Sequence, residues 1–154
     1  MFVQIISFAS PEYDELLALR YQILREPLGL EYTPEAIAQE YKDTHFGCYD
    51  AHFQLLGGLL LHDIGDNIYQ MRQVAVKTSI QNQGVGKLLV QKSEQYAQQR
   101  QFAQIFLEAR QAAIPFYLKL NYQIEGEIYT KISIPHQNMR KILNPATPFL
   151  APNV

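Results

Sequence analysis

Two glycines stand one residue apart where a long helix is expected to begin, in the stretch "QVAVKTSIQNQGVGKLLVQKSEQYAQQR" from Gln73 to Arg100. The residue order predicts a short apolar strand, a polar turn and then a helix. A glycine inside a helix costs roughly 1 kcal/mol relative to alanine, so Gly84 and Gly86 need a positional reason. The first N–H groups of a helix lack partners within it and carry partial positive charge. The turn therefore predicts an anion site, where glycines let the backbone approach a phosphate.

Two nucleotide-binding motifs do not fit this turn. A P-loop requires Gly, four residues and then Gly-Lys-Ser/Thr, but Leu88 follows Gly86 and Lys87. Gln81 stands where the earlier glycine of that motif belongs. A dinucleotide fingerprint requires a third glycine at the position of Leu89. These differences argue against a nucleotide-hydrolysing protein.

What remains, Gln81-x-x-Gly84-x-Gly86, resembles the Gln/Arg-x-x-Gly-x-Gly/Ala signature of the GNAT superfamily of N-acetyltransferases. "MRQVAV" before the turn resembles the fourth strand of that family. "LEARQAAIPFYLKLNY" resembles its later strand and helix, with Phe-Tyr at 116–117 and Asn-Tyr at 121–122 replacing Gly-Phe. "LRYQILREPLGL" and "ISIPHQNM" resemble the N-terminal helix of a bacterial branch and the ending of some members. The resemblance covers nearly the whole chain and implies a small bacterial stand-alone member.

The resemblance implies that acetyl-CoA lies where the fourth and fifth strands splay apart, with no metal. Backbone amides of the glycine turn would hold the pyrophosphate. The backbones of Val74 and Val76 would pair with the pantetheine arm like an added strand, and an N–H there would polarise the thioester carbonyl. The cofactor-binding residues implied are Val74, Val76, Gln81, Asn82, Gln83, Gly84, Val85, Gly86 and Lys87.

The implied reaction is direct attack of an amine on the thioester. The amine must lose a proton, and the departing thiolate benefits from gaining one. Tyr117 occupies the position that commonly serves as the general acid, although a tyrosine of the hydrophobic core is the structural alternative. Glu108, at the end of the fifth strand, is the candidate base, acting through water. It could instead be a structural partner of Arg72 or Arg110.

The expected acceptor is an amine of a small molecule or peptide. Arg20, Arg25 and His136 are predicted to lie at its site, and the arginines would favour an acceptor that also carries a carboxylate. Because no base is evident, a non-catalytic module that binds acetyl-CoA or CoA is the alternative function. Release of free thiol during turnover of an amine would separate the two.

Composition excludes several other classes of protein. A formal net charge of -2 argues against nucleic acid as a partner. Cys48 is the only cysteine, so no intramolecular disulfide is expected. The start of the chain lacks the features of a secretory signal, and no apolar run approaches the roughly 18 residues that cross a bilayer. We expect a cytoplasmic protein without a membrane partner, and a homodimer is compatible with the sequence.

The elements that must position these residues form a mixed α+β pattern. Ser10 with Pro11 and Thr33 with Pro34 each predict a helix start. The predicted order is a strand, two helices, three strands, a helix, a strand, a helix and two strands. The resemblance implies the GNAT fold: a mixed, mostly antiparallel sheet of about seven strands, splayed between the fourth and fifth and flanked by about four helices. We expect a single domain over residues 1–154, with an irregular tail at 143–154.

Overall fold

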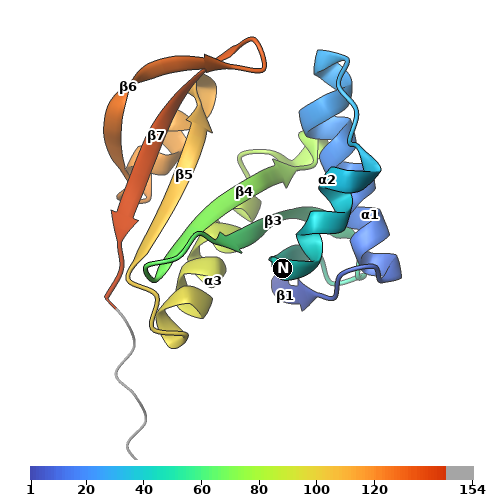
Figure 1. The fold of residues 1–154 in the computed structure, drawn as a ribbon. Helices are drawn as coiled ribbons and strands as arrows, with labels where there is room; N and C mark the ends of the chain where they lie inside the picture. Colours follow the sequence, from blue (N-terminus) through green and yellow to red (C-terminus); the bar gives the residue numbers. More distant parts are fainter. Residues whose placement is uncertain (145–154) are drawn as a thin grey trace, which may run out of the picture.

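A seven-stranded mixed sheet flanked by four α-helices makes up residues 1–144, the part of the chain that the computed structural model describes (Figure 1). The strands are β1 (Phe2–Ile6), β2 (Thr44–Tyr49), β3 (Leu55–Asp63), β4 (Ile68–Val76), β5 (Gln104–Arg110), β6 (Gln123–Lys131) and β7 (Ile134–Ile142). The α-helices are α1 (Pro11–Arg20), α2 (Pro34–Gln39), α3 (Val85–Gln99) and α4 (Ile114–Lys119). The predicted element order and α+β class are confirmed. Most of the predicted irregular tail, residues 145–154, lies outside the described residues.

The first two helices begin at the residues that the sequence predicts. The side chains of Ser10 and Thr33 each accept a backbone N–H bond from the first turn, and a proline follows each cap. After α1 the chain continues through a π-helical turn (Tyr21–Arg25) and a 3₁₀ turn (Glu26–Leu28), and then reverses at Gly29 with φ 66°. Within residues 1–144, no helix combines the length and apolar character needed to cross a membrane.

The sheet splits between β4 and β5. Its strand order is β1-β2-β3-β4-β5-β7-β6, and β4–β5 is the parallel pair among these antiparallel neighbours. The two strands pair only from Ile68 opposite Gln104 to Met71 opposite Leu107, and then diverge (Figure 1). β5 continues alongside β7 as far as Arg110. The splay that the resemblance implies is therefore present, and it leaves one edge of β4 free.

A bulge in β4 lies where the strands part. Gly58 pairs with Ala75 while Leu60 pairs with Arg72, so β4 has one residue more than β3 in this interval. Gln73 adopts φ 56°, an uncommon conformation for a non-glycine residue. The Tyr32 hydroxyl donates a hydrogen bond of 2.7 Å to Gln73 Oε1. The loop between α1 and α2 thus contacts β4 at its bulge.

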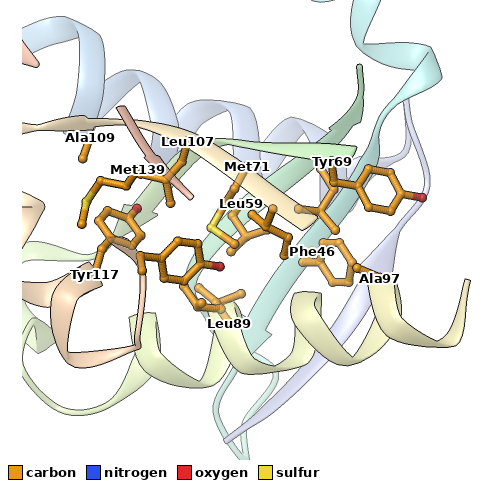
Figure 2. Packing of buried hydrophobic residues seen from close by; sticks show 14 of the residues in the cluster. Phe46, Leu59, Tyr69, Met71, Leu89, Ala97, Leu107, Ala109, Tyr117 and Met139 are labelled. Atoms are coloured by element: carbon orange, nitrogen blue, oxygen red, sulfur yellow. The ribbon is translucent and has the colours of Figure 1, made fainter. Parts of the chain in front are cut away.

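The main core lies between the sheet and α3. Its buried members include Leu59, Met71, Leu89 and Met139, and Tyr117 from α4 belongs to the same cluster (Figure 2). Cys48, the single cysteine, is fully buried there. This packing holds α3 against the half of the sheet that β1 to β4 form.

A buried ion pair joins α1 to the segment after α2. Arg20 is 1% exposed, and its two terminal nitrogens each lie 2.7 Å from an oxygen of the Glu40 carboxylate. The Tyr13 hydroxyl donates to the same carboxylate at 2.9 Å. Burial favours protonated Glu40, but the hydrogen bonds and charge of Arg20 outweigh it and hold the pKa of that carboxyl below its usual value. Arg20 therefore has a structural partner.

Candidate active site

The free edge of β4 presents backbone groups that no neighbouring strand pairs with in residues 1–144. Lys77 N–H donates to Leu56 O of β3 at 2.9 Å. Because successive residues of a strand turn their backbone groups to opposite edges, the N–H and C=O of Val76 face away from β3. On that side Gln81 Nε2 donates a hydrogen bond of 3.3 Å to Val76 O. The same alternation places the backbone groups of Val74 on the free edge. Both residues predicted to pair with an extended ligand thus lie where a ligand could pair with them.

The N-terminus of α3 has no side-chain cap from the described part of the chain, residues 1–144. Gly84 precedes it with φ 86°, no side chain caps it, and no acidic residue stands in its first turn. The first helical bond runs from Leu88 N to Gly84 O. Within residues 1–144, no hydrogen bond is formed by the N–H groups of 85–87. This differs from α1 and α2, which have side-chain caps, and it leaves donors for an outside anion.

The two glycines of the turn have different structural reasons. At Gly84 the positive φ favours glycine, and a Cβ there would meet no atom within 4 Å. At Gly86 a Cβ would lie 3.2 Å from the Phe116 ring, tighter than usual contact. The sequence predicts that both glycines allow close approach of a phosphate. The structure gives Gly86 an additional role, the close packing of α4 on the start of α3.

A cavity of about 700 Å³, here called the α3 cavity, is bounded by the free edge of β4, the glycine turn and α4. Its charged lining residues are Lys87 and Lys119, with no carboxylate. Of the predicted cofactor residues, its lining includes Val74, Val76, Gln81, Asn82, Gly84, Val85, Gly86 and Lys87, and leaves out Gln83. Sequence reasoning missed Ile23, Ala75, Ala113, Phe116, Lys119 and Leu120. Phe116 could have been found from the Phe-Tyr pair, whereas no signal links Ile23 to this place.

A second cavity, of about 260 Å³ and here called the arginine cavity, lies between the ends of β4 and β5. Its ionisable lining residues, apart from Tyr117, are Arg25, Arg72, Glu108, Arg110, Lys131 and His136. Arg25 is thus at the predicted place, whereas Arg20 lines neither cavity. The sequence indicates Arg72 and Arg110 only as possible partners of Glu108. Arg72 follows Gln70 by two residues on β4, and Arg110 follows Glu108 by two residues on β5. This shared spacing on neighbouring strands is the sequence signal that could have indicated the two arginines.

The two cavities meet at Val74, Ala113 and Tyr117, which line both. Tyr117 is 6% exposed, and its ring packs edge-on against Phe116 and Tyr122. Burial raises the pKa of the Tyr117 hydroxyl above its usual value. The phenol therefore keeps its proton at neutral pH. Among residues 1–144 its hydroxyl has no hydrogen-bond partner, so it is available to a ligand at the junction.

Two groups that could take up a proton line the arginine cavity. Glu108 accepts a 2.5 Å hydrogen bond from Lys131 on β6, so its ion pair is with neither Arg72 nor Arg110. His136 Nδ1 lies 2.8 Å from the carbonyl oxygen of Ile134. Because a carbonyl only accepts, Nδ1 carries the hydrogen, and Nε2 of the neutral ring keeps a lone pair. Residues 1–144 contain no group of three or more potential metal ligands.

Comparison with known proteins identifies the family. Residues 11–122, more than half of the chain, match the family model for the Acetyltransferase (GNAT) family. A candidate N-acetyltransferase from Lactobacillus plantarum is 23% identical, with a TM-score of 0.80 over 93% of this chain and 99% of that one. An aminoglycoside 6'-N-acetyltransferase complexed with coenzyme A is 17% identical, with a TM-score of 0.77 over 96% and 99%. The ribosomal-protein-S18-alanine N-acetyltransferase of Escherichia coli is 17% identical, with a TM-score of 0.74 over 97% and 99%.

These solved structures share the fold at low identity, and the family model supplies the assignment. The splayed strands β4 and β5, the glycine turn and the helix that follows it all fall within residues 11–122. The chain belongs to the GNAT acetyltransferase family.

Proposed function

We propose that this chain moves the acetyl group of acetyl-CoA directly to an amine of a small molecule or peptide, as a single N-acetyltransferase domain. The observation that carries the proposal is the meeting of the two cavities at Val74, Ala113 and Tyr117. Direct transfer requires that the amine and the thioester reach one point from two sides. A cavity suited to an anionic, extended ligand and a separate polar cavity that join at a tyrosine meet this requirement.

The α3 cavity has the properties needed to bind coenzyme A. Its unpaired amides at residues 85–87 suit phosphate oxygens, and Lys87 and Lys119 add positive charge. The free edge of β4 can pair with the amide groups of a pantetheine arm, as an added strand would. The volume of about 700 Å³ lies within the range of ligand pockets, about 300–1,000 Å³. The complex of the aminoglycoside 6'-N-acetyltransferase with coenzyme A, on the same fold, supports this assignment.

Within this proposal, Tyr117 at the junction and one residue of the arginine cavity transfer the protons. The Tyr117 hydroxyl donates a proton to the departing sulfur, and an N–H at the free edge of β4 polarises the thioester carbonyl. Glu108 or His136 accepts the proton of the amine, and pH–rate profiles of Glu108→Gln and His136→Gln decide between them. The variant that loses the acid limb of the parent's profile identifies the base, and retention of that limb in both excludes both residues.

Coenzyme A is expected to stabilise the protein. At a coenzyme A concentration of about 100 times Kd, the free energy of unfolding rises by roughly 2.7 kcal/mol. For a chain of 154 residues this raises Tm by several degrees. Differential scanning fluorimetry gives the shift, and thiol release with a panel of amines gives the activity. No shift with saturating acetyl-CoA would overturn the cofactor assignment.

The same two measurements test the alternative, a non-catalytic module that binds coenzyme A. One feature favours it: Glu108, the carboxylate within the lining of the two cavities, is already paired with Lys131. This reading predicts a Tm shift with no thiol release from any amine, whereas the enzyme releases one thiol for each amine acetylated.

Gly84→Asp is expected to weaken coenzyme A binding by about tenfold or more relative to Gly84→Asn. The two side chains have the same shape, and Asn tolerates positive φ, as Asn82 does at 65° in this turn. Only the aspartate adds negative charge near the expected phosphates, an effect that solvent at this exposed turn reduces. Isothermal titration gives both dissociation constants, and Tm without ligand checks that the variants are equally stable. Unchanged affinity in both variants would show that the ligand does not contact the turn.

A further inference from the structure

The arginine cavity carries positive charge that the protein does not neutralise. Arg25, Arg72 and Arg110 line it, and none of them forms an ion pair within residues 1–144. The carboxylate of its lining, Glu108, is paired with Lys131. The excess is local, because the formal net charge of the whole chain is -2. Three arginine charges thus remain at the face where the acceptor would bind.

Neutral groups hold each of these arginines in place. Arg110 donates to the backbone oxygen of Leu24 at 3.1 Å, and Arg72 donates to Gln70 Oε1 at 2.6 Å. The Arg25 guanidinium lies 5.0 Å from the centre of the Tyr32 ring. These contacts orient the side chains and leave their charges uncompensated.

Two of the arginines repel one another. Arg110 is half-buried, and its burial lowers the pKa of the guanidinium, with the neighbouring charge of Arg25 lowering it further. The chain reaches this arrangement from two distant segments, the turn after α1 and the end of β5. Like charges brought together in this way are unfavourable unless an anion lies between them. Guanidinium groups bind carboxylates through paired N–H donors, which makes a carboxylate the matching ligand.

We propose that the acceptor is an amine that also carries a carboxylate, such as an amino acid, and that Arg25 and Arg110 bind this carboxylate. The inference rests on the proposed function and specifies its substrate class. The carboxylate lies against the two arginines, and the amine points to the junction at Val74 and Tyr117, in the same cavity. The cavity of about 260 Å³ is below the usual range for drug-sized ligands and suits a small acceptor.

Matched pairs of amines test this assignment through thiol release with acetyl-CoA. The pairs are L-alanine with L-alaninamide, 4-aminobutyrate with n-butylamine, and 2-aminoethyl phosphate with ethylamine. The parent protein is expected to turn over a carboxylate-bearing amine with at least a tenfold higher kcat/KM than its carboxylate-free partner, because hydrogen bonds to a charged group are stronger than those to a neutral one. Equal kcat/KM within both carboxylate pairs would overturn the inference. Selective turnover of the phosphate-bearing amine alone would overturn the choice of a carboxylate.

Variants of the two arginines locate the effect. Arg110→Gln and Arg25→Gln are each expected to raise KM for the carboxylate-bearing amine by about tenfold or more. For the partner amine without a carboxylate, kcat/KM is expected to stay nearly unchanged. Lys92→Gln removes the same charge from an exposed position of α3 away from both cavities, and is expected to change neither. Equal losses for both members of a pair would mean a structural role and overturn the assignment.

The experiments distinguish failure of the proposed function from failure of the substrate class alone. If coenzyme A neither stabilises the protein nor yields thiol with any amine, the proposed function fails. If coenzyme A stabilises the protein and amines without a carboxylate react as well as those that carry one, only the substrate class fails. A second readout is the Tm of the CoA-saturated protein with each amine. If coenzyme A stabilises the protein but no carboxylate-bearing amine is turned over or raises Tm further, the substrate class is again overturned.

Discussion

Tyr117→Phe is expected to lower turnover by about 10² to 10⁴ while the Kd for acetyl-CoA stays nearly constant. Phenylalanine keeps the ring and its contacts with Phe116 and Tyr122 but removes the hydroxyl. Burial raises the pKa of this hydroxyl, so it still carries its proton up to at least about pH 10, the usual value for tyrosine. Loss of a proton donor that acts only in the transition state lowers kcat and kcat/KM together. Steady-state kinetics and titration with acetyl-CoA measure the two quantities separately.

Tyr122→Phe is the matched control for this experiment. Tyr122 is 1% exposed and packs against Tyr117, but it lines neither cavity, and its hydroxyl bonds to Glu94 at 3.4 Å. We expect a lower Tm with turnover near that of the parent. If Tyr117→Phe behaves in the same way, Tyr117 is a core residue without a catalytic role. Catalysis would then depend on positioning and on the backbone amides of β4.

Glu40→Ala is expected to destabilise the protein by about 3–5 kcal/mol. Arg20 is 1% exposed, so removal of the carboxylate leaves a buried guanidinium without its counter-charge. The variant Arg20→Met with Glu40→Gln removes the buried charge and keeps an acceptor for the Tyr13 hydroxyl. Urea unfolding is expected to show that this double variant recovers most of the loss. A double variant as unstable as Glu40→Ala would show that the uncompensated charge is not the cause.

The same ion pair makes a prediction for stability against pH. The pKa of Glu40 is lower in the folded state than the value of about 4.3 for an unperturbed glutamate. A lowered pKa contributes stability above the unfolded value and loses it as pH falls through the folded value. Stability of the parent is therefore expected to fall below about pH 4 more steeply than that of the double variant. Parallel curves for the two proteins in this range would contradict the assignment.

The sequence by itself determined the local elements and the place of the glycine turn before α3. Helix starts follow from local chemistry, because a serine or threonine cap and a following proline act on the backbone next to them, as at Ser10 and Thr33. The alternation and apolar runs of the strands are equally local. The glycine spacing before α3 predicted a helix start with an anion site, and Gly84 has the positive φ that glycine favours. Together with the resemblance, these signals were sufficient for the fold.

Only the tertiary structure decided which side chains share a site. The bulge at Gln73 could not be predicted from the sequence, because no glycine stands at that position. There the hydroxyl of Tyr32, 41 residues away in sequence, donates a hydrogen bond to the Gln73 side chain. Arg20 and Arg25 are five positions apart on one helical segment, yet one pairs with Glu40 in the core and the other reaches the arginine cavity. The partner of Glu108 is Lys131, on a strand that is not its direct neighbour in the sheet. Charges find their partners through the packing of distant segments, and the local sequence does not contain that information.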